Sequence, residues 1–428
     1  MTTKSNFRLS LASLDMIQVI NYLIIRVKKM FKKFEYKILY KRIFFTCLIL
    51  VIYIIGSNIS IVSNENLRTH KDSFFKLAIT NVGGDLHTLN IFSLGLGPWL
   101  SSMIILTLIN HKSNDKVKTQ TRRERHFKER ALTLIISAAQ GFYIIHSYIN
   151  KHAIKDSNML ILLLVLITGT LLMVWLADQN TTYGISGPMP IVLMSLVKSI
   201  FNTHFPKLNS SASLITMIIV LLMLTLFILF FIELTEYRIE YNDIMNISAK
   251  DIPSYLSWKL NPAGSISIMV SLSLFMLTNN IVNFIGRFIV NHNFETQVFN
   301  FTNPVGITIY ILLQMILGYF LSRLLINTKR KSKEFLKNGN YFEGIQPGQQ
   351  TEKFLGSKAR RICWFGSIVV AIVLAIPMYS ALLVPHLLKE VYFTTQIIVF
   401  VYIGINIAET IRAYLYFDSY KQILNKYW

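Results

Sequence analysis

The stretch Ser93–Ile109, "SLGLGPWLSSMIILTLI", joins residues that break helices to residues that cross membranes. Its second half is apolar enough for a buried helix, whereas its first half carries Gly95, Gly97 and Pro98. Glycine costs about 1 kcal/mol in a helix interior and proline about 3 kcal/mol. Non-helical backbone at membrane depth persists only where protein covers it or where it lines water. The stretch therefore predicts a membrane span whose head borders a cavity or a pore.

Apolar segments of similar length recur along the 428 residues, of which 53% are hydrophobic and only 15% are charged. Soluble domains carry about 25% charged residues. The composition predicts an all-α polytopic membrane protein, and so many spans exclude a cleaved signal peptide as the explanation of any one of them. We expect ten transmembrane helices, near residues 43–62, 91–110, 131–149, 158–177, 187–203, 212–232, 264–286, 305–327, 362–384 and 394–416.

Lysine and arginine gather in three segments that the span count puts on one side of the membrane. Residues 1–42 hold ten of them, residues 111–130 hold eight and residues 328–361 hold nine. Such an excess marks the cytoplasmic side, so we expect both termini to lie in the cytoplasm. The net charge of +21 has two explanations, which are topology with attraction to anionic lipid, or a docking face for a soluble partner.

Catalytic and metal-binding patterns are not found in the sequence. Cys47 and Cys363 lie in or beside predicted spans, and the nine histidines show no metal-ligand spacing. No phosphate-binding loop or nucleophile elbow appears. We expect no enzyme activity, no cofactor and no nucleic-acid partner, so the energy for any transport must come from a partner or an ion gradient.

A second run of helix breakers, Asn261–Gly264, heads the seventh predicted span. If ten spans form two sets of five, the second and seventh spans hold corresponding places, and paired interruptions favour a functional centre between the halves. The alternative is the general frequency of glycine and proline in membrane helices. The segment 328–361 has turn residues at its middle and basic flanks, which predicts a structured cytoplasmic finger loop.

Five motifs occur in an order that resembles the SecY family, the central subunit of the bacterial protein-conducting channel. They are "GGDLHTLNIFSLGLGPWLSSMII" (83–105), "GTLLMVWLADQNTTYGISGP" (169–188), "SYLSWKLNPAG" (254–264), "FLKNGNYFEGIQPGQQTEKFL" (335–355) and the tenth span (394–420). The resemblance implies two pseudo-symmetric five-helix halves, 43–203 and 212–416, around a central pore. It also implies a plug at 75–90, the finger loop 328–361 and a cytoplasmic tail at 417–428. The basic residues at helical spacing in 1–42 separately predict a cytoplasmic amphipathic lead-in on the inner membrane surface.

The resemblance assigns a ring of apolar side chains to the pore waist, where an apolar constriction resists ions by dewetting. The ring residues are Leu100, Ile104, Leu193, Val197, Met269 and Val399. The plug would bend and swing at glycines and a proline, with Asp85 facing a water-filled funnel. The plug and hinge residues are Gly83, Gly84, Asp85, Gly95, Gly97 and Pro98. For each of these side chains the alternative is ordinary packing against protein or lipid.

The second and seventh spans would form a lateral gate through which an apolar signal enters lipid. Polar side chains near this gate would bond weakly across it, since such bonds average about 0.6 kcal/mol in membranes. The candidates are Gln140, Thr278, Asn279 and Asn280. For Asn279 and Asn280 the alternative is capping of a broken or interfacial helix end.

The departures from the family pattern lie mainly on the cytoplasmic face. Gln346 stands where the family has an arginine, Tyr237 replaces one of two paired arginines and Arg238 remains, Pro188 replaces a glycine, and Asn406 replaces a carboxylate. This pattern looks like the accessory SecY of Gram-positive bacteria, which works with an accessory SecA motor to export serine-rich glycosylated adhesins. The expected motor-docking residues are Arg238, Gln346, Gly348, Lys353 and Lys358.

The resemblance further implies SecE-like and SecG-like small subunits or accessory equivalents, an unfolded preprotein as substrate, and contact with anionic lipid. Two alternatives share part of this interpretation. A housekeeping SecY or a membrane-protein insertase has the same fold with other cargo. An ion-coupled transporter of a small solute would need more ionisable residues at mid-membrane depth than the chain offers.

Overall fold

The computed structural model describes residues 37–61, 78–85, 89–112, 121–150, 159–202, 212–243, 254–289, 303–383 and 388–425. Most of the predicted lead-in at 1–42 lies outside these residues, as do 75–77 and 86–88 of the predicted plug. Residues 426–428 of the predicted tail also lie outside them.

Ten helices of the described chain overlap the ten predicted spans. In the first half they are α2 (Lys37–Asn58), α4 (Gly97–Lys112), α5 (Arg122–Asn150), α6 (Met159–Tyr183) and α7 (Met189–Asn202). In the second half they are α8 (Ala212–Leu234), α9 (Gly264–Ile289), α10 (Pro304–Ile326), α12 (Gln349–Leu383) and α13 (Leu388–Asn425). By length and apolarity, six candidate spans are found among the described residues, and α4, α7 and α8 contribute shorter apolar stretches. This architecture makes the protein a multi-pass helical membrane protein.

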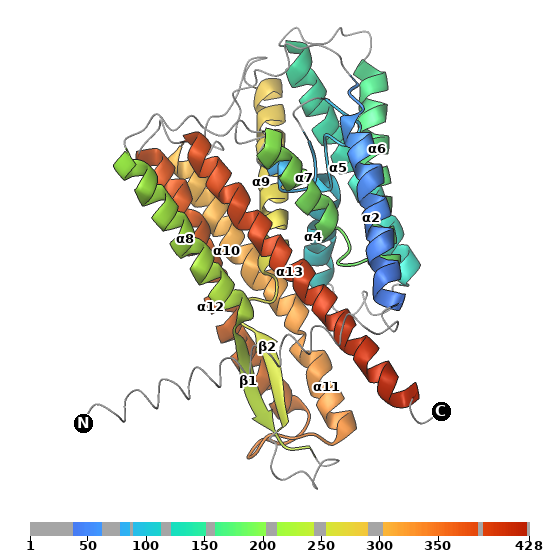
Figure 1. Ribbon diagram of the computed structural model, residues 1–428, viewed down its shortest axis with the longest axis vertical. Helices are drawn as coiled ribbons and strands as arrows, with labels where there is room; N and C mark the ends of the chain where they lie inside the picture. Colours follow the sequence, from blue (N-terminus) through green and yellow to red (C-terminus); the bar gives the residue numbers. More distant parts are fainter. Residues whose placement is uncertain are drawn as a thin grey trace, which may run out of the picture.

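The helices form two groups that meet along two lines of contact (Figure 1). In the first group α4 packs on α5, α5 on α6, and α2 on α6 and α7. In the second group α10 packs on α9 and α12, and α12 on α8 and α13. Between the groups, α4 and α5 contact α9, which we call the gate seam, and α2 and α7 contact α13, which we call the back seam. One apolar core continues through both groups.

A small module projects from one end of the bundle (Figure 1). Strand β1 (Glu236–Tyr241) pairs antiparallel with β2 (Ser254–Lys259), and both lie beside helix α11 (Thr328–Asn338) and the start of α12. The side chains of this module form a second apolar core, which includes Ile239, Trp258, Phe335, Phe342 and Leu355. The sequence analysis predicted a structured finger here but neither the strands nor α11, and it began the ninth span thirteen residues later than α12 begins.

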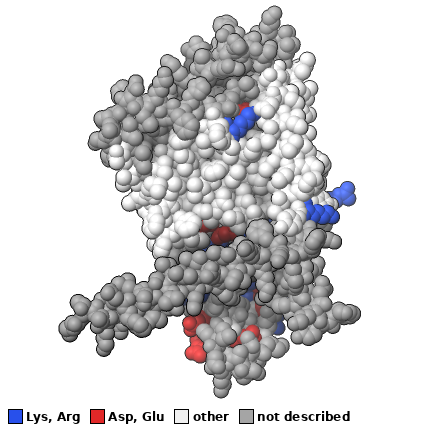
Figure 2. Space-filling model, viewed as in Figure 1, with Lys and Arg blue, Asp and Glu red and all other residues white. Residues whose placement is uncertain are grey.

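Charged side chains are unevenly distributed on the face drawn in Figure 2. The described surface of the helical bundle shows few charged groups there, with basic atoms in its upper part and at its right edge, and acidic atoms are most visible toward the end that carries β1 and β2. Exposed apolar side chains on α2 and α8, such as Phe44 and Phe227, are 72% and 71% exposed. An apolar belt of this kind fits a protein whose solvent is lipid.

Candidate functional site

The part of the predicted plug that the structure describes, residues 78–85, is folded against the head of α4. We call it the plug segment. A turn of helix at 78–80 leads to Gly83, whose φ of 84° lies in the left-handed region, and Gly95 has a φ of 62°. The Leu96 N–H donates to the Val82 carbonyl at 2.9 Å, and a Cβ on Gly95 would overlap the backbone of Gly84. Glycine is therefore required where the two segments pack backbone to backbone.

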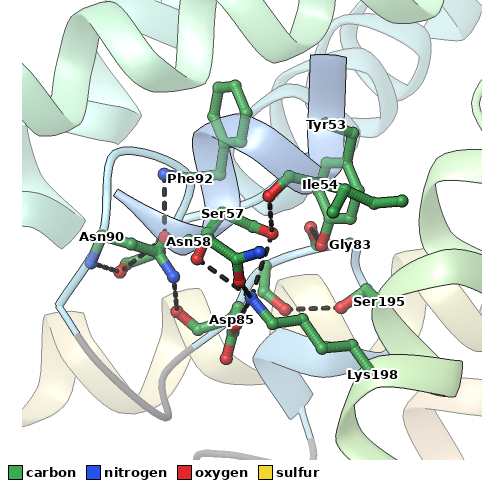
Figure 3. Close-up of polar contacts among 12 residues, drawn as sticks. Tyr53, Ile54, Ser57, Asn58, Gly83, Asp85, Asn90, Phe92, Ser195 and Lys198 are labelled. Carbon is green, nitrogen blue, oxygen red and sulfur yellow. Dashed lines mark hydrogen bonds and ion pairs between the residues drawn. The ribbon is translucent and has the colours of Figure 1, made fainter. Parts of the chain in front are cut away.

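The carbonyl groups of the plug segment are bound by neighbouring helices (Figure 3). The Tyr53 hydroxyl of α2 donates to the Gly83 carbonyl at 3.1 Å, and the Ser195 hydroxyl of α7 donates to the Gly84 carbonyl at 2.6 Å. These bonds satisfy buried backbone acceptors that have no helix or sheet partner.

The environment of Asp85 differs from the sequence-based expectation. We expected it to face a water-filled funnel, but the residue is only 4% exposed. Its carboxylate lies 2.8 Å from the Lys198 amine of α7 (Figure 3). Burial of a carboxylate is costly unless it is paired, so the ion pair explains how the plug segment keeps a charge inside the protein.

Two hydroxyl groups cross the gate seam between α4 and α9. The Ser101 and Ser273 hydroxyls lie 2.7 Å apart, and Ser273 also donates to the Gly97 carbonyl at 2.6 Å. Because a hydroxyl has one hydrogen, Ser273 must receive its hydrogen bond from Ser101. Small residues allow this close approach of two membrane helices. Neither serine was among the predicted gate residues.

The predicted gate residues of α9 contribute differently from the expectation. Thr278 bonds to the Leu274 carbonyl of its own helix at 2.8 Å. Asn279 accepts from Asn283 at 3.0 Å, and Asn283 in turn donates across the seam to the Tyr143 hydroxyl of α5 at 3.3 Å. The bond that crosses the seam is thus made by Asn283, one helical turn beyond Asn279.

Asn280 and Gln140 both line a small cavity beside the plug segment, with Ile79, Val82 and Ser273. The side-chain amide of Asn280 is buried, and neither its oxygen nor its nitrogen has a hydrogen-bond partner among the described residues. The cavity, about 10 Å³, is just large enough for one water molecule. An amide without a protein partner at the gate seam reduces the cost of separating α5 from α9.

The six predicted pore-ring residues differ in how deeply they are buried. Four of its residues are at most 4% exposed and belong to the continuous apolar core: Leu100, Ile104, Met269 and Val399. Leu193 is half-buried against that core, and Val197 is half-buried. The assignment of these six side chains to a pore waist stays a prediction.

The predicted docking residues lie in the projecting module. Arg238 on β1 is exposed and stacks on the Tyr255 ring at 4.6 Å. Gln346 is also exposed, and its side-chain oxygen accepts from Gln350 at 3.2 Å. Gly348 has a φ of 106°, which favours glycine, and its carbonyl accepts from a serine of α11.

Lys353 and Lys358, both on α12, differ in exposure. Lys353 is exposed, whereas Lys358 is half-buried and donates to the Tyr237 hydroxyl of β1 at 3.3 Å. Its amine also lies 5.7 Å from the centre of the Phe354 ring. Lys358 therefore connects β1 to α12 within the module, and Lys353 is the freer of the two for contact with a partner.

A group of charged residues that the sequence analysis did not identify joins the module to the bundle. The Glu233 carboxylate at the end of α8 has a side chain only 2% exposed and lies 3.3 Å from the Lys259 amine of β2. Lys259 also pairs with Glu409 of α13. Nearby, Asn261 donates to the Tyr402 hydroxyl of α13. Lys259 of β2 thus links α8 and α13. The sequence signal for this group was the presence of isolated charges near the ends of predicted spans.

Comparison with known proteins agrees with this architecture. The family model for SecY matches residues 90–408. The accessory Sec system protein translocase subunit SecY2 of Staphylococcus epidermidis is 99% identical over 399 residues, covering 93% of this chain and all of that protein. The proteins of the same description from Staphylococcus haemolyticus and Staphylococcus aureus are 61% and 54% identical to this chain. The matches cover 93% and 94% of this chain, respectively, and the whole of each relative.

Solved structures are similar in fold at low sequence identity. A protein-conducting channel gives a TM-score of 0.66 at 15% identity, covering 88% of this chain and 92% of that one. Sec61 in the canine ribosome–channel complex gives a TM-score of 0.55 at 14% identity with the same coverage. The motif series, the two five-helix groups and these matches agree. The chain therefore belongs to the SecY family of protein translocase subunits and groups within it with the accessory Sec system SecY2 proteins.

Proposed function

We propose that this chain is the channel subunit of an accessory Sec translocase that passes unfolded proteins across the bacterial cytoplasmic membrane. The observation that carries the proposal is the plug segment, which is buried between two helical groups and held by individual hydrogen bonds and one ion pair. Together these contacts would hold the plug segment in place in the idle channel, and each is weak enough to break when a substrate enters. Separation of the gate seam would open a path beside the plug segment and give an apolar signal access to lipid.

A SecA-type motor of the accessory kind would dock on the projecting module. Its second apolar core gives the module a fixed shape, and the exposed Arg238, Gln346 and Lys353 present polar groups on it. Serine-rich glycosylated adhesins are the proposed cargo, and SecE-like and SecG-like subunits or accessory equivalents the proposed companions. The basic segments would face the cytoplasm, with both termini, and contact anionic lipid there.

The proposed path is tested by cross-linking a stalled export substrate to single cysteines in a chain whose Cys47 and Cys363 have been replaced by serine. Met269→Cys lies at the predicted waist, where the native side chain is 1% exposed. Met223→Cys on α8 is the matched control, because Met223 is 63% exposed on the outer surface of the bundle. We expect the first variant alone to cross-link, and only while a motor and ATP are present.

Equal cross-linking at both positions, or none at either, would contradict the proposed path. Running the assay with accessory and housekeeping motors in parallel separates the accessory function from that of a housekeeping SecY or an insertase. Uptake of a small solute driven by a pH gradient, without motor or ATP, would favour the transporter alternative. That alternative has little support, because the buried Glu233 and the half-buried Lys198 lie near the ends of α8 and α7 and both have ion-pair partners.

A further inference from the structure

The Lys198 amine lies where the plug segment, α2 and α7 meet (Figure 3). Besides Asp85 at 2.8 Å, it contacts the carbonyl and the hydroxyl of Ser57, each at 3.0 Å, and the side-chain oxygen of Asn58 at 2.7 Å. An ammonium group has three hydrogens, which the three oxygens of α2 accept, and the Asp85 carboxylate adds an ion pair to these three hydrogen bonds. Residues 57 and 58 are the last of α2, where unpaired carbonyls and the negative end of the helix dipole attract a cation.

The two partners of this ion pair differ in what they lose when the plug segment moves. Lys198 would keep its contacts with α2, because α2 and α7 pack on each other within the first half. Asp85 would lose its cation, and its side chain is only 5% exposed in the present state. The ion pair is therefore made and broken by the plug segment alone, while the lysine stays in place.

The position of Lys198 on α7 aligns it with a second plug contact. Ser195 precedes it by three residues, which puts both side chains on one face of the helix. Ser195 bonds to the Gly84 carbonyl at 2.6 Å and Lys198 binds the carboxylate of the next residue. Val192, three residues earlier still, is among the nearest neighbours of Gly83. One face of α7 thus contacts successive residues of the plug segment, and among the described residues the ion pair is the charged interaction between the two.

We propose that Lys198 is an electrostatic latch that holds the plug segment closed through Asp85 and releases it without itself moving. The latch deepens the proposed function, on which it rests, by naming the residue pair that sets how readily the idle channel leaks. Asp85 acts as the mobile half and Lys198, anchored on the end of α2, as the fixed half. Both are positioning residues, since neither is required to contact the substrate.

The latch is tested by ion flux through the full-length protein reconstituted in liposomes without motor or substrate. Asp85→Asn and Lys198→Met should each raise the leak more than tenfold, because removing one partner of a largely buried ion pair costs more free energy than a tenfold change requires. The double variant should leak no more than either single variant, because both changes remove the same interaction. Lys198→Arg keeps the charge and should stay sealed.

Two controls make the result specific to the latch. Lys259→Met removes another half-buried, ion-paired lysine far from the plug segment and should not raise the leak. Size-exclusion chromatography of each variant excludes simple misfolding as the source of flux. Additive leaks in the double variant would indicate general loosening and would overturn the latch.

A deletion of residues 78–85 separates failure of the latch from failure of the channel. The deletion removes the plug segment and should leak at least as strongly as the single variants. If it leaks while Asp85→Asn and Lys198→Met stay as tight as the unchanged protein, the latch is overturned and the channel stands. If every variant is silent, the deletion included, the proposed channel function is overturned and the latch with it.

Discussion

Replacing Ser273 by alanine tests whether the gate seam controls access to the channel. Ser273 is 1% exposed and makes both hydroxyl contacts between α4 and α9, receiving from Ser101 at 2.7 Å and donating to the Gly97 carbonyl at 2.6 Å. The change to alanine removes one oxygen and leaves the apolar packing intact. Its effect should therefore fall on the balance between the closed and the open seam.

The size of the effect follows from the number of bonds lost. Hydrogen bonds between membrane helices average about 0.6 kcal/mol each, so the loss of two destabilises the closed seam by about 1.2 kcal/mol. Since 1.4 kcal/mol corresponds to tenfold, the ratio of open to closed seam should rise about sevenfold. A precursor whose apolar signal core has been shortened, and which the unchanged gate mostly rejects, should enter proteoliposomes about sevenfold better.

Ser271→Ala is the matched control on the same helix. Ser271 is as deeply buried as Ser273, but it bonds to Gln314 of α10, which belongs to the same half. Its loss should leave entry of the weakened precursor unchanged. If both alanine variants raise entry equally, the cause is loosening of α9 in general, and if neither does, the α4–α9 contact is not the gate.

Four other substitutions probe the module and its attachment. Lys259→Met should lower the thermal midpoint in detergent, because Glu233 stays buried without its cation at a cost of about 3–5 kcal/mol, and Lys259→Arg should restore it. Phe342→Ala, at a residue 4% exposed in the second core, should cost about 3–5 kcal/mol and make residues 328–361 the first site of limited proteolysis. Lys353→Glu should weaken motor binding to vesicles while the proteolysis pattern stays the same. Lys358→Glu should change both, and identical behaviour of the two would contradict the distinction between an exposed and a tethered lysine.

The architecture was predictable because hydrophobic length and helix breakers act locally. Apolar runs near 20 residues located the ten helices, although the second span was expected from residue 91 and α4 begins only at Gly97, between the breakers Gly95 and Pro98. The helix starts at Gly97, and Gly95 lies in the left-handed region before it. These features depend on a few neighbouring residues, which the sequence displays directly.

Pairings between distant segments were not predictable from the same signals. Asp85 was expected to face a water-filled funnel, and only the packing of α7 on the plug segment makes it the partner of Lys198. In α9 the polar run that begins at Thr278 was predicted to bond across the gate seam, whereas the contacts across that seam come from Ser273 and Asn283. Polarity alone does not tell which face of a helix meets which neighbour, and successive residues point about 100° apart.

Both seams contain neutral hydrogen bonds, such as that from Gln396 to Ser199 across the back seam at 3.1 Å, but among the described residues the back seam also has a charged contact. We expect this difference to determine which seam separates first. The gate seam is crossed by neutral hydroxyl and amide bonds, and it contains the unpaired amide of Asn280. The back seam includes Arg42 of α2, which bonds to the Tyr414 hydroxyl at 3.2 Å and lies 4.7 Å from the centre of that ring. Charge-assisted bonds are about twice as strong as neutral ones, and a cation over a ring adds about 0.5–1 kcal/mol. When a substrate forces the halves apart, the gate seam should therefore yield while the back seam acts as the hinge.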